Sequence, residues 1–233
     1  MTSDEQGREG KPGRVTGRSS LVAALSESPL YAILDTGTLA GRSMEEALDG
    51  LLRAGVRVVQ YRHKAPFGRV NFEQCVALAR RVHESGGVFI VNDRADVADL
   101  SGADGVHLGQ DDLPPEKARS YLGDSRLIGY STHTLDQARH AMQLPVDYIA
   151  IGPVFSTVTK ENPDPVVGLA TVAAVRALTN KPLVAIGGIT MENAASVLDA
   201  GADAVAVIRD LTAAPDLEVR AREFLGVFKK RGR

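Results

Sequence analysis

Short runs of apolar, often β-branched residues recur along the chain from Leu30 onward, separated by segments with apolar residues at every third or fourth position. Runs that are apolar on both faces are typical of buried parallel strands, whereas the wider spacing predicts amphipathic helices. The predicted strands cover residues 30–34, 56–61, 88–91, 105–108, 127–130, 148–151, 183–186 and 204–208. The predicted helices include residues 43–54, 71–84, 135–143, 169–178 and 191–198.

This strict alternation predicts an α/β fold in which helical crossovers connect parallel strands. Eight such units close most simply as a (β/α)8 TIM barrel, and residues 21–233 are expected to form it as one domain. An open doubly wound sheet is the alternative, but no GxGxxG motif follows the first strand. Residues 21–25 are expected to form a short helix that covers the bottom of the barrel.

Residues 1–20 mix glycine, serine and charged side chains without apolar periodicity, so we predict a disordered tail. The rest of the composition is ordinary for a globular protein of 233 residues, with 44% hydrophobic side chains and a formal net charge of -2. The absence of a basic excess speaks against nucleic acid as a partner, and no apolar run is long enough to span a membrane.

Cys75 is the only cysteine, so the chain has no internal disulfide and no CxxC pair for zinc. A soluble, cytoplasmic protein is expected. Because Cys75 falls within a predicted amphipathic helix, we expect it to serve packing. The oligomeric state is left open, and a homo-oligomer is compatible with the sequence.

In a barrel, the active site lies at the carboxyl ends of the strands, so the polar residues at those positions matter most. The second predicted strand ends in a run in which alternation points Gln60, Arg62 and Lys64 inward, while Tyr61 and His63 face the helices. Burying two cations near the barrel axis is costly without an anion, which favours an anionic ligand over a simple solvated strand end.

Carboxylates follow the next two strands. Asn92 and Asp93 end the third strand and Asp112 follows the fourth, and neighbouring strands bring such side chains close together. Mg²⁺ is commonly held by one or two carboxylates together with substrate phosphates. The alternative is that each aspartate only caps the helix that follows it.

The remaining strand ends carry further polar groups. Ser131 follows the fifth strand, and a long loop after the sixth contains Thr157, Thr159 and Lys160. Long loops of this kind are commonly binding lids, which makes Lys160 a candidate mobile cation rather than a solvated lysine.

The seventh and eighth strands end in Gly187-Gly188 and Ile208-Arg209. Loops at these two positions often form a phosphate cup, although a tight turn without a ligand also needs glycine. His107 and His133 could carry a proton near neutral pH, but His107 is expected to be a hydrogen-bonded core group. No nucleophile and base pair is evident.

Taken in order, these segments resemble the thiamine-phosphate synthase family. The resemblance rests on the motifs QYRHK (60–64), VNDR (91–94), GVHLGQDD (105–112), GYSTH (129–133), DYIAIGPVFSTVTK (147–160), AIGGI (185–189) and GADAVAV (201–207). It implies a barrel enzyme that uses Mg²⁺ and two small phosphorylated substrates, a pyrimidine diphosphate and a thiazole phosphate, and releases diphosphate first in a dissociative step.

The resemblance also implies roles for individual residues. The pyrimidine diphosphate would be bound by Gln60, Arg62, Lys64, Asn92, Ser131 and Lys160, of which Arg62, Lys64, Ser131 and Lys160 would act in catalysis. Asp93 and Asp112 would bind Mg²⁺, and the thiazole phosphate would lie against Thr157, Thr159, Gly188, Ile208 and Arg209.

Two positions depart from the family pattern. Arg209 stands where serine is common, and Leu34 precedes Asp35 where threonine is usual. Backbone donors at 208 and 209 would survive the first change, so only the role of the Arg209 side chain is put in doubt. The alternatives within the fold are a thiazole tautomerase and a relative that binds thiazole phosphates without catalysis, but relatives of both kinds lack the complete set of cations and carboxylates found here.

Overall fold

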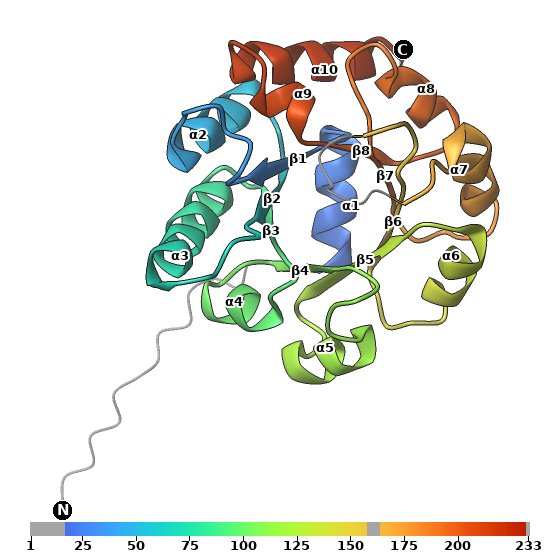
Figure 1. Ribbon diagram of the computed structural model, residues 1–233, viewed down its shortest axis with the longest axis horizontal. Helices are drawn as coiled ribbons and strands as arrows, with labels where there is room; N and C mark the ends of the chain where they lie inside the picture. The colour runs from blue at the N-terminus through green and yellow to red at the C-terminus, as the bar shows by residue number, and fades with distance from the viewer. Residues whose placement is uncertain (1–16, 158–163, 232–233) are drawn as a thin grey trace, which may run out of the picture.

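The computed structural model describes residues 17–157 and 164–231, and the strands in these ranges close into an all-parallel barrel. Strand order follows chain order, and β8 pairs with β1 to complete the ring (Figure 1). The strands are β1 (Leu30–Asp35), β2 (Val58–Arg62), β3 (Val88–Asn92), β4 (Gly105–Leu108), β5 (Leu127–Thr132), β6 (Tyr148–Ile151), β7 (Leu183–Ile186) and β8 (Ala204–Val207). The predicted (β/α)8 TIM barrel is confirmed, and the open doubly wound sheet is excluded.

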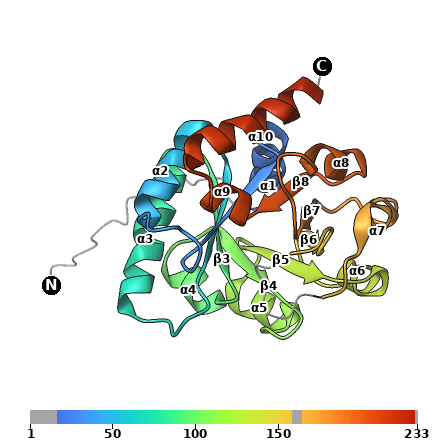
Figure 2. The same ribbon diagram turned by 45° about the horizontal axis from the view of Figure 1, so that its top comes forward.

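Helices follow the strands and surround the ring on its outside (Figure 2). They are α2 (Met44–Ala54), α3 (Arg69–Glu84), α4 (Ala95–Leu100), α5 (Pro115–Leu122), α6 (Leu135–Ala141), α7 (Gly168–Arg176), α8 (Ala194–Asp199), α9 (Arg209–Thr212) and α10 (Leu217–Arg231). The sequence pattern had singled out five of them, and α4, α5, α9 and α10 are additional. None of the helices in the described ranges combines the length and apolarity that crossing a membrane requires.

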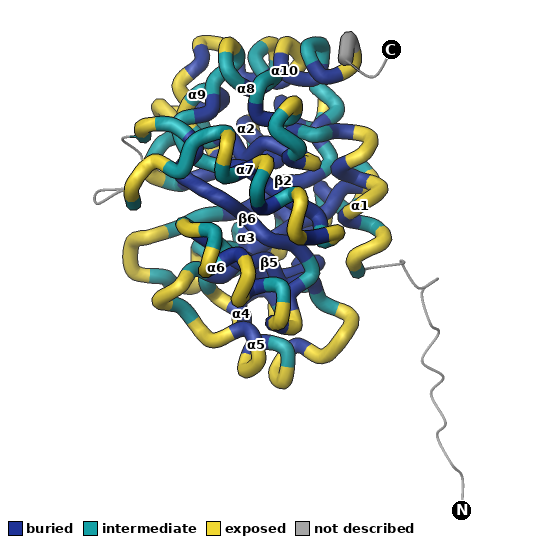
Figure 3. Tube along the Cα trace, turned by 90° about the vertical axis from the view of Figure 1, so that its right-hand side faces the viewer, coloured by how far each residue is buried: buried dark blue, intermediate teal, exposed yellow. Residues whose placement is uncertain are grey.

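The apolar residues form two cores because side chains of a strand alternate between its two faces. Outward-facing residues such as Val59 and Phe89 pack against the helices, whereas inward-facing residues such as Val58 and Ile90 fill the barrel. Both faces of the strands are therefore buried, and the exposed residues lie on the outer helices and loops (Figure 3). This arrangement explains why the strands read as continuous apolar runs.

An additional helix, α1 (Arg18–Glu27), packs against the inner core. Its Leu21 and Leu25 are almost fully buried against barrel residues, and in Figure 1 the helix lies across the centre of the ring. The predicted helix at the bottom of the barrel is thus confirmed, but it begins at Arg18, so residues 18–20 are helical rather than part of the tail. The rest of that predicted tail, residues 1–16, lies outside the described residues.

Some predicted boundaries shift for identifiable reasons. The second strand was expected from Val56, yet the Val56 N–H donates to the Leu51 carbonyl at 3.0 Å and Gly55 has a φ of 100°. These two features end helix α2, so β2 begins only at Val58. Strand β5 extends beyond its predicted end because Ser131 and Thr132 pair with β6.

Candidate active site

A cavity of about 830 Å³ opens at the carboxyl ends of the strands, where a barrel active site is expected. Side chains from all eight strands line it. The predicted site residues among them are Gln60, Arg62, Lys64, Asn92, Asp93, Asp112, Ser131, Thr157, Gly188, Ile208 and Arg209. The structure therefore brings these residues into one cavity, while Thr159 and Lys160 lie outside the described residues.

The cations of β2 already have carboxylate partners in the protein. Arg62 forms an ion pair with Asp35, which is opposite it in the register of β1 and β2. The Asp35 side chain is only 6% exposed and also accepts a hydrogen bond from the Gly37 N–H at 2.8 Å. Burial lowers the pKa of the Arg62 guanidinium, and the negative charge of Asp93 opposes this shift. Burial of these cations thus does not by itself require an external anion, as the sequence argument had assumed.

Lys64 forms the second pair, with its Nζ 2.5 Å from Oδ2 of Asp93. The lysine side chain is about half exposed, so an incoming ligand can reach it. An ion pair at such an accessible position contributes little to stability, typically about 1 kcal/mol or less. Lys64 can therefore exchange Asp93 for an anionic ligand at small energetic cost.

Asp93 and Asp112 lie next to each other at the rim of the cavity. The pKa of Asp112 is raised, chiefly by burial and further by the Asp93 carboxylate, while a hydrogen bond from the Gly109 N–H at 2.7 Å opposes the rise. Two neighbouring carboxylates repel each other unless a proton or a cation lies between them. This arrangement fits a divalent cation that takes two protein oxygens and completes its shell with other oxygen ligands.

The alternative that these aspartates cap the following helices is not supported. The N-cap residue of α4 is Arg94, and that of α5 is Pro114. Asp93 instead has a φ of 63°, which is unusual for a residue with a side chain. Within the described residues no group of three or more His, Cys, Asp or Glu side chains gathers as a metal site, so a cation here would have to draw further ligands from a substrate or water.

Asn92 adds a donor to the same side of the cavity. Its side-chain amide nitrogen is buried and has no hydrogen-bond partner among the described residues. An unpaired buried donor is costly, and a ligand oxygen placed against it would relieve that cost.

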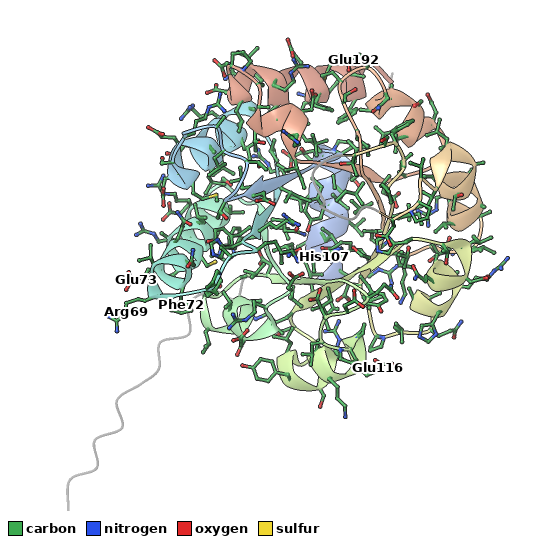
Figure 4. All side chains as sticks on the ribbon, in the orientation of Figure 1. Arg69, Phe72, Glu73, His107, Glu116 and Glu192 are labelled. Carbon is green, nitrogen blue, oxygen red and sulfur yellow. The ribbon has the colours of Figure 1, made fainter. Side chains whose placement is uncertain are left out.

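The floor of the cavity is a continuous chain of buried polar groups. The Gln60 amide nitrogen donates to the Tyr31 hydroxyl at 2.9 Å, which lies 2.9 Å from the Tyr148 hydroxyl. The Tyr148 hydroxyl is 3.0 Å from Nδ1 of His107, and Nε2 of His107 is 2.8 Å from Oγ of Ser131. Figure 4 shows His107 near the centre of the ring, unlike the other labelled residues at the periphery.

Burial keeps the titratable groups of the floor uncharged near pH 7. Burial lowers the pKa of His107 to about 4; the Asp112 charge opposes this shift and the Lys64 charge adds to it, so the ring is neutral near pH 7. Burial raises the pKa of Tyr31 and Tyr148 well above their usual value. His107 is thus the hydrogen-bonded core group that the sequence predicted. Cys75 is likewise a buried packing residue, and burial raises the pKa of its thiol to about 12.

The opposite side of the cavity is built from backbone. Gly187 and Gly188 have φ values of 98° and 64°, and a Cβ on Gly188 would overlap the Ser156 carbonyl oxygen. Both glycines are required by the turn itself. The Gly188 N–H, which lies outside every helix and strand, donates to no acceptor within the described residues. It is thus available to a ligand.

Arg209 begins the short helix α9 at the cavity rim. Its side chain is exposed and forms no ion pair with the described residues. His133, in contrast, lies beside the cavity with Nδ1 2.7 Å from the Gly152 carbonyl oxygen and 3.5 Å from Oδ2 of Asp164. Its ring is thus held by the protein on the β6 side.

Sequence reasoning missed three contributors: Tyr31, Asp35 and Tyr148. Asp35 could have been found, because it ends β1 directly beside the strand that carries Arg62. Tyr31 and Tyr148 belong to short apolar strand segments, in which a tyrosine is expected to be a core residue. Only their inward direction and mutual hydrogen bond distinguish them.

Comparison with known proteins gives a consistent family. Residues 30–211 match the family model described as thiamine monophosphate synthase. The thiamine-phosphate synthase of Koribacter versatilis is 46% identical over 211 residues, which cover 89% of this chain and 99% of the relative. That of Pelotomaculum thermopropionicum is 39% identical, covering 90% and 96%.

A solved structure gives the same result for the fold. The thiamine phosphate pyrophosphorylase of Pyrococcus furiosus superimposes with a TM-score of 0.81 at 31% identity. The match covers 89% of this chain and 98% of that structure. The similarity therefore extends over the whole barrel rather than over a single motif.

Proposed function

The chain belongs to the thiamine monophosphate synthase family, and from that premise we propose the reaction of its cavity and the roles of its residues. The enzyme is a transferase that makes thiamine phosphate. The substrates are 4-amino-2-methyl-5-hydroxymethylpyrimidine diphosphate and a 4-methyl-5-hydroxyethylthiazole phosphate. The observation that carries this proposal is the convergence of Arg62, Lys64, Asp93 and Asp112 at one side of the cavity.

The charged side binds the diphosphate. The positively charged side chains of Arg62 and Lys64 pair with the diphosphate. Lys64 exchanges its contact with Asp93 for one with a phosphate oxygen. Asn92 donates its unpaired amide N–H, and Gln60 lies at the floor where the pyrimidine ring enters. Lys160, which lies outside the described residues, is proposed as a further cation from the loop after β6.

Asp93 and Asp112 are proposed to hold Mg²⁺ at this side. When bound together with the diphosphate, the ion supplies positive charge that offsets the charge of the leaving group. The repulsion between the two carboxylates favours such a cation, and it would also free Lys64 from Asp93.

The backbone side binds the thiazole phosphate. Gly188 and the backbone at Ile208 and Arg209 present N–H groups to the phosphate, and Thr157 lies on the same side of the cavity. With the phosphate held there, the thiazole ring is oriented toward the pyrimidine, which converts a bimolecular encounter into a reaction between fixed partners.

The chemistry then needs no protein nucleophile. The bond between the pyrimidine methylene and the diphosphate oxygen breaks, and diphosphate leaves with the electron pair. The electron-rich aminopyrimidine supports the positive methylene, and the lone pair of the thiazole nitrogen forms the new C–N bond. Arg62 and Lys64 stabilise charge that develops on the departing diphosphate, and this is electrostatic catalysis.

The test is to mix the two substrates with the protein, with and without Mg²⁺, and to measure thiamine phosphate and diphosphate. The proposal expects equal amounts of both products and no reaction after chelation. A chain that only isomerises or binds the thiazole phosphate would release no diphosphate. We propose that the reaction takes place in the cytoplasm.

A further inference from the structure

The buried hydrogen-bond chain beneath the cavity has a direction, which follows from counting hydrogens. Gln60 donates its amide N–H to Tyr31, so the Tyr31 hydroxyl hydrogen is free for Tyr148. Tyr148 then donates to Nδ1 of His107, and the neutral ring carries its one hydrogen on Nε2, from which it donates to Ser131. In this order the Tyr31, Tyr148 and His107 hydrogens all have acceptors within the chain, and only the Ser131 hydroxyl hydrogen is left for the cavity.

The reverse order leaves a defect. If Ser131 donated to His107 and Tyr148 donated to Tyr31, the Tyr31 oxygen would accept from both Tyr148 and Gln60. Its own hydrogen would then have no acceptor among these groups. An unsatisfied buried donor costs about 1 to 3 kcal/mol, so the forward order is favoured.

The barrel makes room for this chain at one position. Gly129 lies opposite both His107 and Tyr148 in the strand register, and a Cβ on Gly129 would overlap the Tyr148 ring. The ring can therefore lie across β5 and stack on His107, with ring centroids 5.5 Å apart. The glycine of the GYSTH segment thus serves the contact between Tyr148 and His107.

The hydrogen-bond chain ends at Ser131, the member nearest the opening of the cavity, and its direction decides how the Ser131 hydroxyl is oriented. Because Oγ of Ser131 accepts from His107, its own hydrogen is directed elsewhere, and Ser131 lines the cavity. A hydroxyl in this state offers a donor to an anionic oxygen. In the reverse order it would offer only lone pairs, which repel an anion.

We propose that His107 and Tyr148 are positioning residues that fix the Ser131 hydroxyl as a hydrogen-bond donor to an anionic oxygen in the cavity. The inference rests on the proposed function for the identity of that oxygen, a phosphate oxygen of the pyrimidine diphosphate. His107 acts through Ser131 and takes no proton itself.

The first test does not depend on activity. Long-range ¹H–¹⁵N NMR of the full chain, with His107 assigned by its absence in His107→Gln, distinguishes the two neutral tautomers. Hydrogen on Nε2 is the expected result. Hydrogen on Nδ1 would overturn the proposed direction, whatever reaction the protein catalyses.

The second test uses a matched pair of variants. In His107→Gln the longer side chain can still place an N–H near Oγ of Ser131, whereas in His107→Asn the amide is too short to reach it. We expect kcat within about threefold of the parent for His107→Gln and a fall of about tenfold or more for His107→Asn, with the KM of the thiazole phosphate unchanged. Equal losses in the two variants would contradict the proposal.

A double-mutant comparison separates positioning from general damage. If His107 acts through Ser131, His107→Asn lowers kcat in the parent but not in a Ser131→Ala background. Tyr148→Phe, which keeps the ring and removes only the hydroxyl, should behave in the same way if His107→Asn fails to fold. Fully additive losses would refute the proposal, whereas absence of product from the parent chain would refute only the proposed function.

Discussion

The two sides of the cavity offer a ligand different kinds of binding group, charged side chains on one side and backbone on the other. The β2–β4 side presents charged side chains that are already paired, Arg62 with Asp35 and Lys64 with Asp93. The β7–β8 side presents backbone, with Gly187 and Gly188 held at positive φ. A ligand on the first side must displace or join existing ion pairs, whereas a ligand on the second meets donors that the turn already directs.

This difference predicts opposite sensitivities to mutation. On the charged side, function depends on the chemical identity of single side chains, and their loss should leave the fold intact. On the backbone side, function depends on the path of the chain, so adding a methyl group should be harmful while removing a side chain should matter little.

The largest effect is expected from Asp93→Ala. Losing one of the two carboxylates should lower the rate of coupling about a thousandfold, since the site for Mg²⁺ would be incomplete. Steady-state assays at several Mg²⁺ concentrations measure this, with Asp124→Ala, a surface aspartate, as the control. The freed Lys64 is half exposed, so the melting temperature should hardly change. Activity similar to that of the control would exclude a role for Asp93 in metal binding.

Between the two sides, the uncharged floor should make stability depend on pH. His107 has a pKa of about 4 in the folded chain and 6.5 in the unfolded chain, so the unfolded state binds the extra proton between these values. The free energy of unfolding should fall as the pH drops from about 6.5 to about 4, by about 3 kcal/mol in total, and the contribution of His107 should then level off. Urea unfolding of the parent and His107→Gln measures it, and parallel curves would contradict the prediction.

On the backbone side, Gly188→Ala should raise the KM of the thiazole phosphate about tenfold or more, because the new methyl group overlaps the Ser156 carbonyl and the residue is held at positive φ. Gly41→Ala is the control, since Gly41 also has positive φ but no atom lies near its added Cβ. Both variants should lose some stability, and only the first should lose affinity. Equal KM values in the two would show that the turn does not bind the phosphate.

The smallest effect is expected from Arg209→Ser. If backbone N–H groups bind the phosphate, the KM of the thiazole phosphate should rise less than about threefold, and that of the pyrimidine diphosphate should not change. A charge-assisted contact from the exposed guanidinium would instead produce about a tenfold rise or more. Kinetics with each substrate varied in turn decide between the two. A large rise in the KM of the thiazole phosphate would show that the Arg209 side chain binds the phosphate.

The sequence predicted the barrel because both faces of every strand are buried, which makes the strands apolar runs, and because helices alternate with them. It also placed the candidate site, since residues at strand ends share one edge of the sheet. The cavity contains all the predicted residues that the structure describes, such as Arg62, Asp112 and Gly188. Their roles are still predictions.

The ion pairs and buried hydrogen bonds that these residues form could not be predicted from the sequence pattern. That Asp35 neutralises Arg62 depends on the register of β1 against β2, which the spacing of apolar residues does not determine. The polar floor depends on which way Tyr31 and Tyr148 point and on the space above Gly129. Such features arise from contacts between distant strands, and a pattern along one strand carries no information about them.

Helix α1 affects the route by which ligands enter and leave the cavity. Its buried leucines pack into the barrel at the end opposite the cavity, so among the described residues the cavity opens only at the carboxyl ends of the strands. When two ligands occupy such a blind-ended chamber at different depths, the deeper one must arrive first and depart last. A barrel closed at one end can therefore impose an ordered sequence of ligand binding and release.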